Sequence, residues 1–141
     1  MSDKKWVLWE NEEMSLQAAF DPAIPRTEGF HLVLLPKKAS PSPWGDPELY
    51  SRMSLVVAKA IFVIMMEPGL ADWVNIHYDG NIGAAKEDPK LHIHIFGRLK
   101  TGPNWGGPLK LPFGEGPYGN EPLTDQEIAR LRSALAKGME Y

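Results

Sequence analysis

Alternating hydrophobic and polar positions predict five short β-strands along this chain. Side chains in a strand point alternately to the two faces of a sheet, so the pattern also predicts which residues lie together. In the last predicted strand, His92 and His94 share one face, and Ile93 and Ile95 point to the other. The predicted strands cover residues 5–9, 16–20, 29–36, 72–80 and 90–98.

Two stretches repeat hydrophobic residues at the spacing of an α-helix. The first has Asp46 as its N-cap and Pro47 at the first helical position, where the missing N–H costs nothing, and it should run to about Met66. The second opens with the capping box "TDQE" at 124–127. The order of elements predicts an α+β fold, an antiparallel sheet of about five strands with two helices on one face.

The length of 141 residues, with 43% hydrophobic and 23% charged residues, predicts one domain over residues 1–141. Its core is expected at about 5–100, and its C-terminal helix at 124–138. Between them, residues 101–122 contain six glycines and five prolines. A loop of this length in a small domain is usually functional or part of an interface.

Charge and cysteine content restrict the function classes. The net charge of −3 argues against a basic surface for nucleic acid polymers, so we expect none as a partner. The absence of cysteine excludes disulfides and thiolate zinc sites and fits a reducing compartment. The N-terminus lacks the apolar core of a signal peptide, and the longest apolar run, "AIFVIMM", is too short to span a bilayer. We therefore expect a soluble cytoplasmic protein that does not enter a membrane.

Candidate chemistry concentrates in "KLHIHIFGRLK", residues 90–100, which holds two of the four histidines. Residues two apart on a strand lie about 7 Å apart on the same face. His92 and His94 could therefore act on one substrate group, one attacking it and the other donating a proton or a hydrogen bond. The alternation alone equally fits two histidines that are simply tolerated on a half-exposed strand.

Several segments around these histidines are similar to one family. "LHIHIFGR" at 91–98 resembles the signature strand of the histidine triad (HIT) family, in which three histidines alternate with apolar residues before an arginine. "HLVLLPKK" at 31–38 looks like that family's strand before its first helix, and "FDPAIP" at 20–25 is similar to its Phe-x-Asp approach. Asn75 falls on the strand where the family carries an asparagine. The resemblance covers roughly residues 5–100, with the elements in the same order.

The resemblance implies a nucleotide phosphohydrolase or nucleotidyl transferase that acts at the α-phosphate of a small-molecule nucleotide. The family's central histidine attacks the phosphorus and forms a nucleotidyl-histidine intermediate, which water resolves without a metal or other cofactor. Aligned on the trailing Gly-Arg pair, His92 is the nucleophile, His94 the third histidine, and Lys90 stands at the first position. The rival register makes His92 first, His94 central and Phe96 third; we prefer the former, which keeps two apolar residues before the Gly-Arg pair.

Several residues could bind the nucleotide, some at positions where the chain departs from the family pattern. Asp21 could bind ribose hydroxyls, although Asp before Pro is also a common turn residue. Gly83, in the loop "DGNIGAAKED", could belong to an anion-binding nest or to a plain turn. The ammonium of Lys90 could neutralise a phosphate but cannot accept a hydrogen bond as imidazole does, and a solvated lysine at the strand edge is the favoured interpretation. The predicted substrate-binding residues are Asp21, His31, Asn75, Gly83 and Lys90.

Three functions stay open at this point. Besides the enzyme, a catalytically weak or inactive nucleotide-binding module is favoured by Lys90 in the place of a histidine. A metal protein using His92, His94 and either His31 or His77 ranks third, because no carboxylate or cysteine is paired at a familiar ligand spacing, and we expect no metal. The family often dimerises through its first helix, and the apolar run at 54–66 suits a homodimer.

Overall fold

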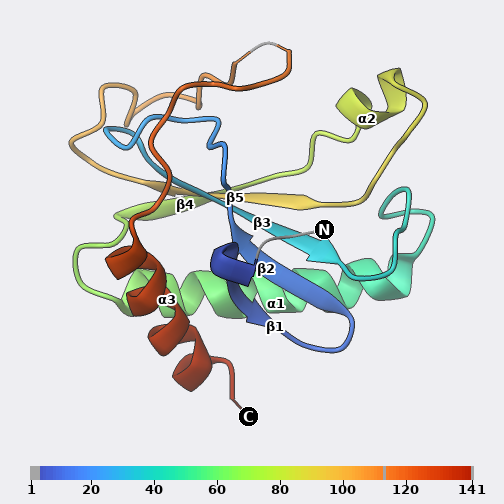
Figure 1. Ribbon diagram of the computed structural model, residues 1–141, viewed down its shortest axis with the longest axis horizontal. Coiled ribbons are helices and arrows are strands. Elements are labelled where there is room, and N and C mark those ends of the chain that lie inside the picture. The colour runs from blue at the N-terminus through green and yellow to red at the C-terminus, as the bar shows by residue number, and fades with distance from the viewer. Residues whose placement is uncertain (1–3, 113, 141) are drawn as a thin grey trace.

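The computed structural model describes residues 4–112 and 114–140. Five strands form one antiparallel sheet in the order β1-β2-β3-β5-β4 (Figure 1). The strands are β1 (Val7–Glu10), β2 (Met14–Ala18), β3 (Gly29–Pro36), β4 (Trp73–His77) and β5 (Ile93–Arg98). The helices are α1 (Pro47–Met66), α2 (Asn81–Ala85) and α3 (Asp125–Gly138), and a 3-10 turn, η1 (Lys4–Trp6), precedes β1.

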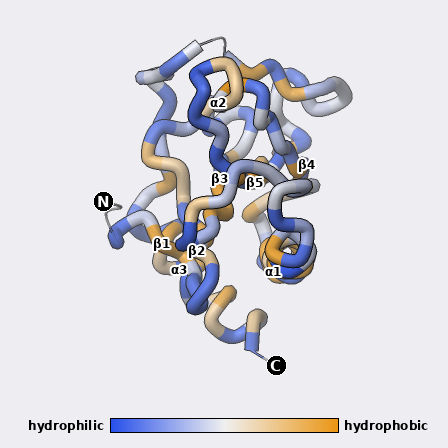
Figure 2. Tube along the Cα trace, turned by 90° about the vertical axis from the view of Figure 1, so that its right-hand side faces the viewer, coloured by the Kyte–Doolittle hydropathy of each residue, from blue (hydrophilic) through white to orange (hydrophobic). Residues whose placement is uncertain are grey.

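The helices α1 and α3 lie on one side of the sheet, and α2 and the loop 101–122 lie on the other (Figure 1). Figure 2 views α1 nearly end-on and shows this division from the side. Leu32 and Leu34 of β3 and Ile95 of β5 are fully buried in the same hydrophobic core as Leu131 of α3. The opposite face of the sheet, which carries the histidines, is thus left to the loops.

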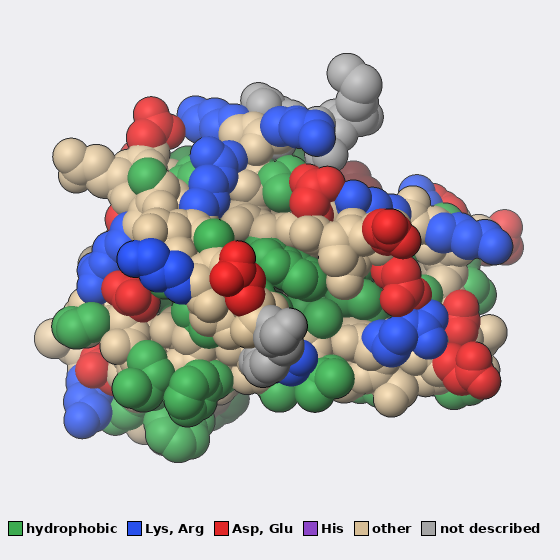
Figure 3. Space-filling model, turned by 90° about the horizontal axis from the view of Figure 1, so that it is seen from below, with side chains coloured by type: hydrophobic (Ala, Val, Ile, Leu, Met, Phe, Trp, Pro, Cys, Tyr) green, Lys and Arg blue, Asp and Glu red, His purple; other side chains and the backbone are tan. Residues whose placement is uncertain are grey.

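Helix α1 begins with the cap that its sequence predicts, because the Asp46 side chain accepts a hydrogen bond from the Leu49 N–H over 3.2 Å. Its length and mean hydropathy of 1.7 would by themselves allow it to cross a membrane, but core helices share both features. Here Leu49, Met53 and Ala60 are among its side chains buried in the core. Other α1 side chains stay exposed, and Figure 3, seen from the side of α1 and α3, shows hydrophobic groups gathered on this surface.

The predicted α+β fold with a five-stranded antiparallel sheet is confirmed, and both predicted helices are present. Helix α2 is an addition, in the segment where the sequence predicts a loop. A helix of five residues contains too few turns to show a hydrophobic period, so the pattern could not indicate it. The last strand begins at Ile93, so that Lys90 and His92 precede it rather than lie within it.

A buried ion pair fixes the start of the 101–122 loop to the sheet. Arg98 at the end of β5 and Glu28 before β3 are both buried, with Arg98 Nη2 3.9 Å from Glu28 Oε2. Asn104 donates two hydrogen bonds of 3.1 Å to Glu28 Oε1, from its backbone N–H and from its side-chain amide. Its carbonyl in turn accepts from Arg98 Nη2 over 2.9 Å. The loop therefore leaves the sheet in a defined direction.

Candidate functional site

His92 lies half-buried immediately before β5, and its orientation is set by the backbone. Its Nδ1 is 2.8 Å from the carbonyl oxygen of Lys90. A carbonyl can only accept, so Nδ1 carries the proton and donates, and in the neutral ring the lone pair is on Nε2. This arrangement gives His92 an unprotonated nitrogen of the kind that a nucleophile needs.

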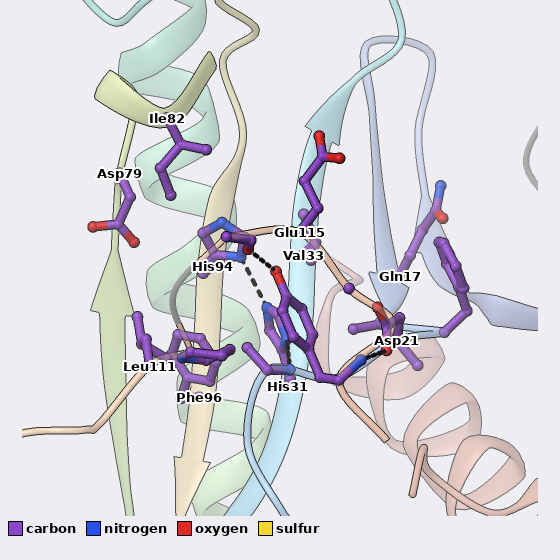
Figure 4. Close-up of a pocket in the computed structure, with 18 of the residues that line it drawn as sticks. Gln17, Asp21, His31, Val33, Asp79, Ile82, His94, Phe96, Leu111 and Glu115 are labelled. Carbon is purple, nitrogen blue, oxygen red and sulfur yellow. Dashed lines mark hydrogen bonds between the residues drawn. The ribbon is translucent and has the colours of Figure 1, made fainter. Parts of the chain in front are cut away.

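His31 and His94 form a chain of hydrogen bonds whose direction also starts at the backbone. The N–H of Ala23 donates to His31 Nδ1 over 3.2 Å, so the proton of the neutral His31 ring is on Nε2. That nitrogen is 2.8 Å from His94 Nδ1, to which it donates (Figure 4). The proton of neutral His94 is therefore on Nε2, which makes His94 a hydrogen-bond donor on the side away from His31.

Burial keeps both of these rings neutral. It lowers the pKa of His31 to about 3, with smaller contributions from the charges of His94, His92 and His77. It likewise lowers the pKa of His94 to about 4, with His92 and His77 adding to the effect and Asp79 opposing it. Near pH 7 the pair therefore donates hydrogen bonds without carrying a charge.

All four histidines lie on the same face of the sheet. His77 of β4 is directly opposite His94 in the β4–β5 register. The ring centroids of His92 and His94 are 4.7 Å apart, and those of His31 and His94 are 5.0 Å apart. Phe96 packs among them, stacked on His31 at 4.4 Å and edge-on to His77 at 5.2 Å. The rings thus form one cluster with an apolar centre.

A cavity of about 550 Å³ opens beside this cluster (Figure 4). Side chains of β2 and β3, including Gln17, Val33 and Leu35, form one wall, and His31 and His94 form another part. The loop at 111–118 supplies much of the opposite wall. The cavity is mostly apolar and has a few polar groups, which is the usual make-up of a small-molecule site.

Asp21 lines the cavity and also holds the loop that covers it. Its Oδ1 accepts a hydrogen bond of 3.1 Å from the Tyr118 N–H, and the Asn120 amide donates to the Pro22 carbonyl over 3.0 Å. A Cβ atom at Gly116 would collide with the Asp21 carboxylate, so a larger residue there would force that side chain to move. One carboxylate oxygen of Asp21, the residue predicted to bind the ribose, is therefore already engaged by the Tyr118 N–H.

The other predicted binding residues lie at the margin of the site or outside it. The Lys90 ammonium is exposed, 3.3 Å from an Asp88 carboxylate oxygen, and it is the carbonyl of Lys90 that contacts His92. Asn75 is half-buried on β4 opposite Phe96 and is not among the cavity's lining residues. Gly83 lies within α2, packed against the Asp88 backbone, and its neighbour Ile82 lines the cavity instead.

Three residues of the site were not singled out from the sequence. Asp79 lines the cavity near His94, and the alternation of His77 with Asp79 could have indicated it. Glu115 and Tyr118 come from the loop 101–122, which the sequence predicts to be functional or part of an interface without indicating single residues. Glu115 forms an ion pair with Lys86, just after α2, and this pair joins the two segments beside the cavity. No sequence signal pairs these two positions.

The histidine cluster also bears on the third function that the sequence leaves open, a metal protein. Across residues 4–112 and 114–140, no three His, Cys, Asp or Glu side chains are arranged to hold a metal ion. Both ring nitrogens of His31 are engaged by hydrogen bonds, and His94 has only Nε2 left unengaged by the described residues.

The sequence matches no protein-family model and none of the curated proteins searched. Similar solved structures do exist. A histidine triad (HIT) protein from Sinorhizobium meliloti is 21% identical with a TM-score of 0.67, covering 94% of this chain and 88% of that one. A zinc-bound histidine triad family protein from Mycobacterium smegmatis is 23% identical with a TM-score of 0.66, covering 93% and 84%.

A uridylyltransferase is more distant, at 15% identity and a TM-score of 0.58, and the match covers 98% of this chain but 43% of that one. All three share the antiparallel sheet with its helices over most of this chain. The histidine cluster described above is thus carried on the fold of histidine triad proteins.

Proposed function

We propose that this protein is a nucleotide phosphohydrolase or nucleotidyl transferase in which His92 attacks the α-phosphorus and forms a nucleotidyl-histidine intermediate. The observation that carries the proposal is the 2.8 Å hydrogen bond from His92 Nδ1 to the Lys90 carbonyl. It leaves Nε2 with the lone pair, as nucleophilic attack requires. Water would then attack the same phosphorus and release the nucleotide.

Lys90 bears on this proposal through its backbone alone. The group that orients His92 is the carbonyl of residue 90, which any amino acid supplies. Its side chain turns instead toward Asp88. A lysine at the place of the first histidine therefore leaves the orientation of the nucleophile intact.

His94 would stabilise charge on the phosphoryl oxygens. His31 donates to His94 Nδ1, so the Nε2–H of His94 is available to the substrate. A donor positioned in advance toward developing charge is among the strongest sources of catalysis. His31 contributes by fixing which nitrogen of His94 carries the proton.

The cavity would hold the nucleoside. Its apolar wall from β2 and β3 suits a base, and the second oxygen of Asp21 could accept from a ribose hydroxyl. The name of the uridylyltransferase, a protein of similar fold, supports nucleotidyl transfer as the reaction class. A cytoplasmic location, expected from the absence of cysteine, completes the proposal.

A second candidate is a nucleotide-binding module with weak or no turnover. The charges around the cavity favour it, because Asp21, Asp79 and Glu115 are among its lining residues. Lys86 is the cation there, and it is engaged by Glu115. A phosphate would meet more negative than positive charge, which slows a reaction that places further charge on phosphoryl oxygens.

Turnover separates the two candidates. Incubation with a nucleoside phosphoramidate or a dinucleoside polyphosphate should release nucleoside monophosphate, and His92→Ala should lower kcat by at least about 10³-fold. Ser133→Ala, at an exposed position of α3, serves as the control and should not change the rate. Saturable nucleotide binding without any product would instead support the binding module.

A further inference from the structure

His77 is the one histidine of the cluster to which the proposed reaction gives no task. It is half-buried at the end of β4, directly opposite His94. In the described part of the chain no hydrogen bond holds either of its ring nitrogens, whereas His31, His92 and His94 are each held by one or two. The His77 ring is partly exposed, and its nitrogens are not engaged by other groups of the residues that the structure describes, so it is available for proton transfer.

The reaction needs such a group. When His92 attacks, a poor leaving group must receive a proton, and when water attacks later it must lose one. His31 and His94 are poor proton carriers, because burial lowers their pKa values to about 3 and about 4. His92 itself is consumed as the nucleophile, and its Nδ1 is engaged by the Lys90 carbonyl.

We propose that His77 is the general acid and base of the nucleotidyl-histidine cycle, an inference that rests on the proposed function. In the first step the Nε2 lone pair of His92 forms a bond to phosphorus, and the bond to the leaving group breaks with its electron pair. The leaving group takes the proton of cationic His77. In the second step water attacks phosphorus and gives its proton back to His77. The bond from phosphorus to His92 breaks, and its electron pair returns to Nε2.

The register of β4 and β5 places His77 beside the histidines of β5. Directly opposite residues have Cβ atoms about 4.5–5.5 Å apart, and diagonal ones lie at about 7–8 Å. His77 is opposite His94 and therefore diagonal to both His92 and Phe96, so a proton would pass between His77 and a group on His92 through an intervening water. Phe96 holds the ring edge-on at 5.2 Å without occupying a nitrogen.

Other titratable groups lie close to His77. His31 of β3 and His94 of β5 line the cavity, as does Asp79, two residues after His77, whereas His77 and His92 are not among its lining residues. Asp79 is the alternative proton acceptor, because a carboxylate can also accept from water. The experiment therefore includes a variant of each.

The probe is the 4-nitrophenyl ester of a nucleoside 5′-monophosphate, whose leaving group departs as 4-nitrophenolate without needing a proton. The native protein should release a burst of 4-nitrophenolate as the adduct forms, followed by slower turnover. His77→Gln should keep the burst, while its steady-state rate falls at least about 100-fold, the usual contribution of general acid–base catalysis. Ile76→Val, on the opposite face of β4, should match the native protein in both phases.

The outcomes for the role of His77 and for the proposed function can be told apart. A His77→Gln steady-state rate within about twofold of native overturns the role of His77, as does a slow step that responds to Asp79→Asn and not to His77→Gln. Thermal unfolding of each variant shows whether a slow rate reflects a loss of folded protein. If the native protein shows neither a burst nor an adduct on His92, the proposed function fails, whatever the variants do.

Discussion

A histidine ring acts through two nitrogens, and in this site backbone atoms decide what each nitrogen does. The Lys90 carbonyl fixes His92 as the ring with a free lone pair. The Ala23 N–H, acting through His31, fixes His94 as a donor. The two neighbouring rings thus have opposite roles that follow from hydrogen bonds rather than from charge.

The buried pair His31 and His94 predicts how stability depends on pH. Both rings are neutral in the folded protein, with pKa values of about 3 and about 4, and both regain an ordinary pKa near 6.5 when unfolded. The unfolded chain therefore binds more protons below about pH 6.5, and the free energy of unfolding falls as the pH falls from there to about 4. Each unit by which the pKa of a ring is lower in the folded than in the unfolded protein is worth about 1.4 kcal/mol in the free energy of unfolding.

Urea denaturation at a series of pH values between 7 and 4 measures this slope. His31→Gln removes one of the two titrating rings, so the loss of stability over the same range should be smaller in that variant. Equal slopes in the native protein and the variant would show that His31 is not held neutral by burial.

The sequence predicts which histidines share a face, and the family resemblance suggests their roles, but neither indicates which ring nitrogen carries each proton. Strict alternation around Ile93 is enough to place His92 and His94 together, and the trailing Gly-Arg pair gives their register. Their proton positions depend on a carbonyl and an N–H, groups that every residue carries. No residue pattern can indicate such contacts.

Among the elements of the fold, the helices with clear N-cap residues are the ones that the sequence predicts most closely. Helix α1 starts at Pro47 behind Asp46, and α3 starts behind Thr124 with both hydrogen bonds of the capping box formed. These local signals do not depend on tertiary structure. The loop over the cavity lacks them, because its path is set by distant partners such as Asp21 and Glu28.

The pair Glu28 and Arg98 predicts a large stability effect from one substitution. Glu28→Gln would leave the Arg98 guanidinium buried without a counter-charge, and breaking a buried pair typically costs about 3–5 kcal/mol. Because Asn104 depends on the same carboxylate, the 101–122 loop should loosen and KM for the nucleotide should rise.

Urea denaturation and steady-state kinetics measure these two effects. The control is Glu12→Gln at an exposed position, which should change the free energy of unfolding by less than about 0.5 kcal/mol. A Glu28→Gln protein as stable as this control would contradict the anchoring role of the pair.

At the scale of the whole molecule, the exposed part of α1 predicts a homodimer. Leu55, Phe62 and Met66 are at least half exposed, and so is Ile76 on the edge strand β4 beside it. Figure 3 shows hydrophobic side chains gathered on this side of the molecule. Together they form an exposed hydrophobic surface beside the edge strand β4, and a twofold interface would bury such a surface.

Light scattering of the purified protein should therefore give the mass of two chains. Phe62→Asp should convert it to one chain, because a charge at the centre of this surface would have to be desolvated. Trp44→Gln, at another exposed aromatic residue, should leave the dimer intact. A native mass of one chain would refute the dimer.

In the proposed reaction His92 becomes covalently linked to a nucleotide. Intact-mass spectrometry after brief exposure to a nucleotide substrate and rapid quenching tests it directly. The native protein should gain the mass of one nucleoside monophosphoryl group, mapped to His92, and His92→Ala should gain none. Release of nucleoside monophosphate without any adduct on the native protein, or an adduct that persists in His92→Ala, would contradict the account.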